Sequence, residues 1–152
     1  IYNGECVKIS SGYVVGGNGS AANIVGVLNG IFFNAATTLK PTFSNFYKAT
    51  ITPANSEDTT AFVIDDPFQQ YVVAADTATG VATFLETYDM NTSAGSDTTG
   101  KSSSTLDIAT TSADGKQFRM LRSAEDPENE DATAVRHSVI VVSNLNSFNG
   151  HN

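Results

Sequence analysis

The chain has 152 residues, a formal charge of −8 from 16 acidic and 8 basic residues, and a single cysteine. This length is enough to bury a core in one domain without disulfide bonds or metal ions. The basic residues are scattered, and the acidic balance disfavours both nucleic acid and an anionic membrane surface as partners. No apolar run approaches the roughly 20 residues of a membrane-spanning helix.

The N-terminal part of the chain is predicted to form a hairpin. Residues 2–9 and 13–15 are apolar-rich runs separated by two serines and a glycine, a pattern typical of two strands and a turn. Cys6 has no partner for a disulfide bond within the chain, so we expect it to be a small buried side chain. The first residue is Ile1 rather than methionine. We therefore expect the chain to begin inside a longer polypeptide, with an N-terminal arm before residue 1.

Two further apolar stretches follow. Residues 24–33 are almost continuously apolar except at Asn29 and Gly30, a pair that predicts either a hairpin turn or a bulge in one buried strand. Residues 61–76 predict a strand, a corner at two aspartates and a proline, and a second strand. Either aspartate, Asp65 or Asp66, can accept a hydrogen bond from the backbone N–H two residues further on. This stretch is therefore predicted to be a structural element of the core.

The next segment changes character. Four apolar residues with the helical spacing i, i+3, i+4 and i+7 predict one short helix; they are Val81, Phe84, Leu85 and Tyr88. Residues 91–104 then form a long polar loop with a single apolar residue. Loops of this length are usually functional or mobile, so this one is a candidate contact arm.

The C-terminal third again has the pattern of β-structure. Two strands are predicted to form a hairpin around Asp114 and Gly115, a further strand follows, and a polar tail covers residues 144–152. The predicted strands cover residues 106–109, 117–121 and 135–142. The whole chain, residues 1–152, is therefore predicted to be a single, mainly β domain. We expect a compact β-barrel or β-sandwich with long loops and at most one or two short helices.

Two groups of polar residues have side chains of the types that bind metal ions or catalyse reactions. The acidic loop 125–131 offers five carboxylates, which would suit calcium, but the helix–loop–helix ligand spacing is absent and Pro127 also fits a solvated turn. These carboxylates are Glu125, Asp126, Glu128, Glu130 and Asp131. Ser138, His137 and Asp131 are the residue types of a nucleophile, base and acid, but neighbours in an extended strand point apart. We therefore predict no catalytic residues, no cofactor and no metal site.

Several stretches in the same order across most of the chain carry a resemblance to a known family. They are residues 1–8, 12–14, 26–33, 40–43 with Tyr47, 61–68, 98–102 with 106–107, and Asn129. Together they resemble a family of small structural proteins of tailed phages, encoded beside the major capsid protein. Members of that family carry a further N-terminal segment and end on Asn-x-His. Here the tail reads Asn144-Leu145-Asn146, so no role of that histidine can be transferred.

The resemblance implies a non-enzymatic virion component, a cement or decoration protein that binds the major capsid protein on the outer surface of the head. We expect a homo-oligomer, with a trimer favoured, and an acidic protein suits a surface away from packaged DNA. The candidate interface residues are Phe43, Phe46, Tyr47, Phe68, Tyr88 and Lys101. The alternative is a tail-associated or cell-surface β-sandwich that serves adhesion or glycan binding, with aromatic side chains lining a groove beside Asp and Asn.

Overall fold

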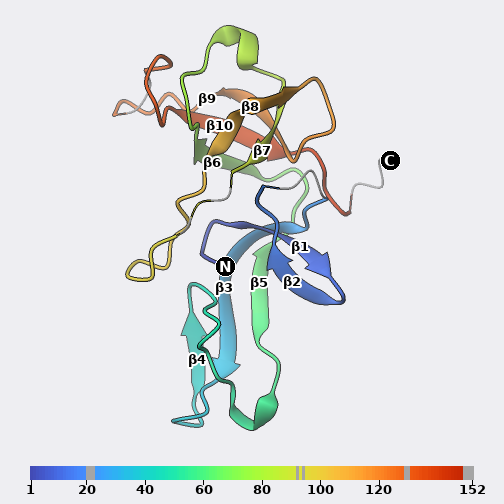
Figure 1. The fold of residues 1–152 in the computed structure, drawn as a ribbon, viewed down its shortest axis with the longest axis vertical. Helices are drawn as coiled ribbons and strands as arrows, with labels where there is room; N and C mark the ends of the chain where they lie inside the picture. Colours follow the sequence, from blue (N-terminus) through green and yellow to red (C-terminus); the bar gives the residue numbers. More distant parts are fainter. Residues whose placement is uncertain (20–22, 92, 94, 129–130, 149–152) are drawn as a thin grey trace.

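The computed structural model of the chain describes residues 1–19, 23–91, 93, 95–128 and 131–148. Within these residues the chain forms two five-stranded antiparallel sheets and two single-turn 3-10 helices, which confirms the mainly β prediction. The two sheets follow one another along the long axis of the molecule (Figure 1). None of the helices that the described residues form is long and apolar enough to cross a membrane.

The N-terminal sheet is built around the long strand β3. It contains β1 (Cys6–Ser10), β2 (Tyr13–Gly16), β3 (Gly26–Asn34), β4 (Pro41–Ser44) and β5 (Thr60–Ile64). The predicted hairpin is confirmed as β1 and β2, which pair Lys8 with Val15. Asn29 and Gly30 do not form a turn. They lie inside β3, where the pairing with β5 shifts register between Leu28 and Gly30, which is the bulge that the sequence left as the alternative.

The C-terminal sheet has the strand order β6-β10-β9-β7-β8. Its strands are β6 (Gln70–Ala74), β7 (Thr87–Met90), β8 (Leu106–Ser112), β9 (Phe118–Ser123) and β10 (Ser138–Ser143). The two edge strands approach each other at one end, where Ala75 forms a parallel bridge to Leu106. The sheet therefore curls around its own core without forming a closed barrel over the described residues. That core consists of Tyr88, Met90, Leu106, Phe118, Met120, Val139 and Val141, together with Cys6 and Ile24 from the N-terminal side.

Two local predictions for this half were wrong. The turn at Asp114 and Gly115 does connect β8 to β9, but these strands do not pair, because β7 lies between them and bonds both. The predicted helix is reduced to the single 3-10 turn η2 (Val81–Thr83). Leu85 has a φ of 68°, which is incompatible with a continuing helix, and Tyr88 belongs to β7. The other 3-10 turn, η1 (Ala54–Ser56), lies in the connection to β5.

The corner at residues 65–69 links the two sheets. As predicted, an aspartate stabilises it: the Oδ1 of Asp66 accepts a hydrogen bond from the backbone N–H of Phe68 at 2.9 Å. The strands on either side, β5 and β6, belong to different sheets and do not pair with each other. Phe68 itself is 79% exposed.

Buried polar contacts join the two sheets. The side-chain Nε2 of Gln117 donates to the carbonyl oxygen of Gly17 at 2.6 Å, and the backbone N–H of Ile24 donates to Leu145 at 2.9 Å. Cys6 is buried, as predicted, and burial raises the pKa of its thiol to about 12. Leu145 shows that the start of the polar tail is packed on the protein, whereas residues 149–152 lie outside the described part of the chain.

Candidate interaction surface

The N-terminal sheet has a smaller cluster of buried side chains than the C-terminal sheet. Its cluster of buried side chains consists of only Val7, Leu28 and Ile31, with half-buried residues packed against it. In Figure 1 this sheet extends as a single layer below the curled C-terminal sheet. Both of its faces therefore have apolar side chains with incomplete cover.

One face carries a group of exposed aromatic and aliphatic side chains, which we call the aromatic face: Phe32, Phe43, Phe62 and Ile64. Phe32 and Phe43 are cross-strand partners in β3 and β4, so they point to the same side of the sheet. The rings of Phe43 and Phe62 lie 6.0 Å apart between centroids. Each of the four residues is between 38% and 62% exposed.

Gly30 explains how Phe43 reaches Phe62. A Cβ at Gly30 would lie 2.5 Å from the Cζ of Phe43, so the ring occupies space that any other residue would fill. The φ of Gly30 is 141°, a conformation that also favours glycine. Gly30 therefore lies at the bulge in β3 and also leaves room for the ring of Phe43 on the aromatic face.

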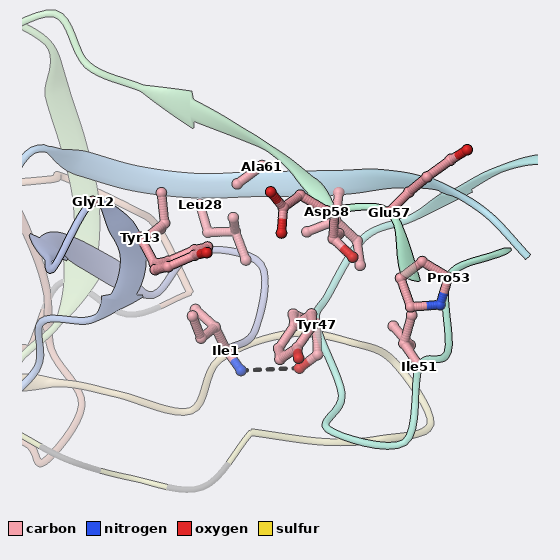
Figure 2. Close-up of a pocket in the computed structure, with 13 residues that line it drawn as sticks. Ile1, Gly12, Tyr13, Leu28, Tyr47, Ile51, Pro53, Glu57, Asp58 and Ala61 are labelled. Carbon is pink, nitrogen blue, oxygen red and sulfur yellow. Dashed lines mark hydrogen bonds between the residues drawn. The ribbon is translucent and has the colours of Figure 1, made fainter. Parts of the chain in front are cut away.

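The opposite face of the same sheet contains a groove of about 650 Å³. Leu28 and Ala61 lie on its floor, while Tyr13 and Tyr47 stand on opposite sides (Figure 2). Ile31 also lines the groove and is the cross-strand partner of Ala61. The other lining residues are Ile1, Gly12, Val14, Ile51, Pro53, Glu57, Asp58 and Thr59. The groove thus has an aliphatic floor and a mixed lining in which polar groups take a large share.

The two carboxylates at the rim differ. The Oε2 of Glu57 accepts a hydrogen bond from the side-chain amide of Asn34 at 3.0 Å, and this side chain points away from the groove (Figure 2). The carboxylate of Asp58 is directed over the groove toward Tyr13 (Figure 2). It has no hydrogen-bond or ionic partner within the described part of the chain.

The long polar loop does not project as a free arm. Its residues 95–102, which we call the strap, lie against the N-terminal segment. The backbone N–H of Asn3 donates to Gly100, and the backbone N–H of Ser102 donates to Asn3, both at 2.9 Å. The side-chain amide of Asn45 donates to the carbonyl oxygen of Thr99 at 2.9 Å. The predicted contact arm is therefore attached to its own protein.

Tyr2 is the main side chain that holds the strap. Its ring stacks on Phe46 with centroids 5.6 Å apart and planes 6° from parallel. On the loop side, a Cβ at Gly95 would lie 2.3 Å from the Cγ of Tyr2, so the ring packs directly on this glycine. The hydroxyl of Tyr2 donates to Asp97 at 2.9 Å, and the Nζ of Lys48 forms an ion pair with the same carboxylate at 2.5 Å.

Acid should release the strap only at low pH. The hydrogen bond from Lys48, followed by that from Tyr2, lowers the pKa of Asp97 below its ordinary value of about 3.9. A carboxylate with a lowered folded-state pKa contributes stability that is present above the unfolded pKa and is lost as the pH falls through the folded pKa. Amide hydrogen exchange at residues 95–101, corrected for intrinsic rates, should therefore show equal protection at pH 7 and pH 5 and lower protection below about pH 4.

The variant Asp97→Asn should show the lower protection already at pH 7. Asp65→Asn is the matched control, because this exposed carboxylate lies in the corner between the sheets, away from the strap. Opening of the wild-type strap between pH 5 and pH 6 would contradict the role given to Asp97.

The six predicted interface residues do not form one surface. Phe43 lies on the aromatic face, Tyr47 lines the groove, Phe46 stacks on Tyr2, Lys101 is an exposed residue of the strap and Phe68 is exposed at the corner. Tyr88 is fully buried in the C-terminal core, so the prediction that it contacts a partner was wrong. Phe32, Phe62 and Ile64 were missed, although the alternation of Phe62 and Ile64 with Ala61 and Val63 indicated a strand with apolar side chains on both faces.

His137 is a structural residue. Its ring is buried, with Nδ1 2.6 Å from the Oγ1 of Thr79 and Nε2 2.9 Å from the Oγ of Ser123. Both ring nitrogens are therefore engaged by these two hydroxyls. The carboxylate of Asp131 instead accepts hydrogen bonds from the side chain and backbone N–H of Thr133, which lower its pKa.

In the described part of the acidic loop, the carboxylates of Glu125 and Asp126 bond to other groups of the protein. The Oδ1 of Asp126 accepts a hydrogen bond from the backbone N–H of Glu128 at 3.1 Å, and Glu125 pairs with Arg122 at 3.3 Å. Glu130 lies outside the described residues. Among the residues that are described, no group of three or more His, Cys, Asp or Glu side chains could hold a metal ion.

No protein-family model, curated protein or solved structure matches this chain. The resemblance to phage virion proteins therefore depends on the sequence stretches alone and stays a prediction.

Proposed function

We propose that this chain is a non-enzymatic structural protein that binds a protein partner through the aromatic face. Following the resemblance, the partner is the major capsid protein of a tailed phage, and the chain acts as a cement protein on the outer surface of the head. The observation that carries the contact role is the aromatic face itself. Exposed apolar side chains scattered singly are normal on soluble proteins, whereas a contiguous exposed group of them is typical of an interaction site.

The cement role would depend on burying aromatic side chains at the interfaces with capsid subunits, which the symmetry of the shell repeats many times. Phenylalanine rings contribute large apolar areas, and a few such anchors supply most of the binding energy of an interface. A cyclic oligomer would present several aromatic faces to the shell at once, so that modest contacts add up through avidity. The charge of −8 disfavours contact with packaged DNA, which supports the outer surface as the location.

The test is cosedimentation of the purified chain with capsids that lack it, followed by heating of the particles. The double variant Phe43→Ser with Phe62→Ser should weaken capsid binding at least about tenfold and remove the thermal protection. The matched control is Phe68→Ser with Val72→Ser, which removes two apolar side chains that are 79% and 69% exposed and lie outside the aromatic face.

Two results would overturn the proposal in different ways. If bare and decorated capsids release their DNA at the same temperature, the cementing role is wrong. If the double variant binds as well as the control, the partner uses another surface. Circular dichroism of both variants checks that the fold is retained.

The adhesion alternative would use the groove as a glycan site, with Tyr13 and Tyr47 as stacking platforms beside Asp58. The floor of the groove is aliphatic and offers few partners for sugar hydroxyls, so we favour protein contact. A glycan array is the direct check, and uniform absence of signal would remove this alternative.

A further inference from the structure

We propose that the groove receives the β3–β4 turn of a second copy of this chain, with Leu39 of the incoming turn on the apolar floor and Lys40 beside Asp58. This inference deepens the oligomer part of the proposed function and rests on it. It does not involve the aromatic face, which lies on the opposite side of the N-terminal sheet.

The groove lacks a positive side chain. No Lys, Arg or His is among its lining residues, and the N-terminal amino group of Ile1 is engaged by the carbonyl oxygen of Tyr47 at 3.0 Å. The carboxylate of Asp58, by contrast, is directed over the groove without a partner among the described residues (Figure 2). Tyr13, which is 63% exposed, and Tyr47, which is 38% exposed, stand on the two sides. A carboxylate and tyrosine rings around an apolar floor together favour a ligand with one cationic group next to an apolar one. The volume of about 650 Å³ accommodates more than one side chain.

The chain itself presents such a pair at the β3–β4 turn. Leu39 is 71% exposed and Lys40 follows it, also exposed. Leu39 has a φ of 53°, an uncommon conformation for a leucine, and its side chain stays in solvent. Lys40 has no ion-pair partner among the residues that the structure describes.

The turn is held in a defined shape. The backbone N–H of Leu39 donates to the carbonyl oxygen of Ala35 at 2.8 Å, and the N–H of Ala35 donates to Lys40 at 3.1 Å. The N–H of Ala36 donates to Thr52 at 3.1 Å, which fastens the turn to the loop before η1. A preorganised turn loses little conformational entropy on docking. Figure 1 places it at the lower end of the N-terminal sheet.

Other apolar residues next to a basic one fit less well. Ile9 and Lys8 are neighbours in β1, which is enclosed between β2 and β3, so they cannot enter a groove together. Tyr47 already lines the groove, and its neighbour Lys48 is paired with Asp97. Val135 and Arg136 are also exposed neighbours, but Arg136 already has an interaction within the chain. The Leu39–Lys40 turn is therefore the occupant that the exposure and charges favour.

A contact between two different surfaces, the turn of one copy and the groove of the next, is heterologous. Such contacts close into a ring when the rotation allows it and otherwise continue as a filament. A ring agrees with the cyclic oligomer of the proposed function.

The test is sedimentation equilibrium of the purified chain, without capsids, over a range of concentrations. The wild type should associate, and either single reversal, Lys40→Asp or Asp58→Lys, should raise the dissociation constant at least about tenfold, because like charges then meet. The combined variant Lys40→Asp with Asp58→Lys should return to within about threefold of the wild type. Leu39→Ser should weaken association about tenfold through lost apolar burial. Asp65→Lys is the matched control and should leave association unchanged.

The proposal is overturned if the wild type is a monomer at every concentration, if the single reversals associate normally, or if the combined variant fails to recover. A groove that binds oligosaccharides or unrelated peptides while the chain stays monomeric also overturns it. All these residues are exposed, so the fold should survive, and equal melting temperatures of the variant monomers check this. Capsid binding is measured separately, so its failure would count against the proposed function and leave the oligomer result intact.

Discussion

Replacing Tyr88 by alanine should lower the free energy of unfolding by about 3–5 kcal/mol. The ring of Tyr88 is fully buried in the C-terminal core, and its hydroxyl donates a hydrogen bond to the carbonyl oxygen of Thr83 at 2.9 Å. Removing it leaves a cavity among tightly packed side chains, because the curled sheet surrounds it. Urea denaturation of the purified chain measures the change.

Two variants calibrate this result. Tyr88→Phe removes only the hydrogen bond to Thr83 and should cost about 1 kcal/mol. Phe68→Ala removes an aromatic ring that is 79% exposed and should stay within about 0.5 kcal/mol of the wild type. A loss below about 1 kcal/mol for Tyr88→Ala would contradict the core position and would restore the interpretation of Tyr88 as a surface contact.

The second large effect is expected at Gly26, where adding one methyl group should cost about 3 kcal/mol or more. In Gly26→Ala the new Cβ would lie 2.0 Å from the carbonyl oxygen of Ile64 and 2.8 Å from its carbonyl carbon. These are backbone atoms of the neighbouring strand β5, so the clash cannot be relieved by rotating a side chain. Strand β3 or β5 must shift where both are paired. Thermal unfolding followed by circular dichroism measures the loss.

Gly80→Ala is the matched control for this prediction. A Cβ at Gly80 would meet nothing within 4 Å, and the φ of this residue is −135°, which any residue adopts. Its unfolding free energy should change by less than about 1 kcal/mol. Equal effects at Gly26 and Gly80 would show that the close approach of β3 and β5 does not hold in solution.

Features encoded by a few neighbouring residues were predictable from the sequence. The β1–β2 hairpin follows from two apolar runs around serines and a glycine, and the corner at Asp66 follows from the local bonding of an aspartate. In each case the signal and the structure lie within about ten residues of each other. The burial of Cys6 was equally predictable from the sequence, since a lone cysteine in such a chain is usually buried.

Strand pairing could not be predicted in the same way. The turn at Asp114 and Gly115 was correctly located, but β7, which precedes β8 in the chain, inserts between the two strands that the turn connects. A turn signal in the sequence shows where the chain reverses direction. It does not show which strands form hydrogen bonds with each other. The expected hairpin was therefore wrong even though its turn exists.

The false helix has a different physical cause. Its apolar spacing combined residues with unrelated environments: Val81 is 84% exposed and Leu85 62% exposed, whereas Tyr88 is buried in β7. An amphipathic helix would bury all of them on one face. The spacing was coincidental, and the left-handed conformation of Leu85 has no signature in a single sequence.

The candidate surface was only partly predictable for a similar reason. Phe43 could be nominated from its aromatic neighbours in sequence. Phe32 and Phe62 become its neighbours only because β3 pairs with β4 on one side and with β5 on the other. The groove likewise gathers Tyr13, Tyr47 and Asp58 from three separate segments, so no local pattern marks it.

The strap also has a consequence for the order in which the molecule assembles. Tyr2 and Asp97 are 95 residues apart in the chain, and Gln117 and Gly17 are 100 residues apart. Contacts of such separation carry a large loop-closure cost and slow down folding. During synthesis the strands of the N-terminal sheet leave the ribosome before the strap and Gln117, which fasten this sheet to later parts of the chain. The sheet can therefore pair its own strands early but gains these long-range contacts only afterwards.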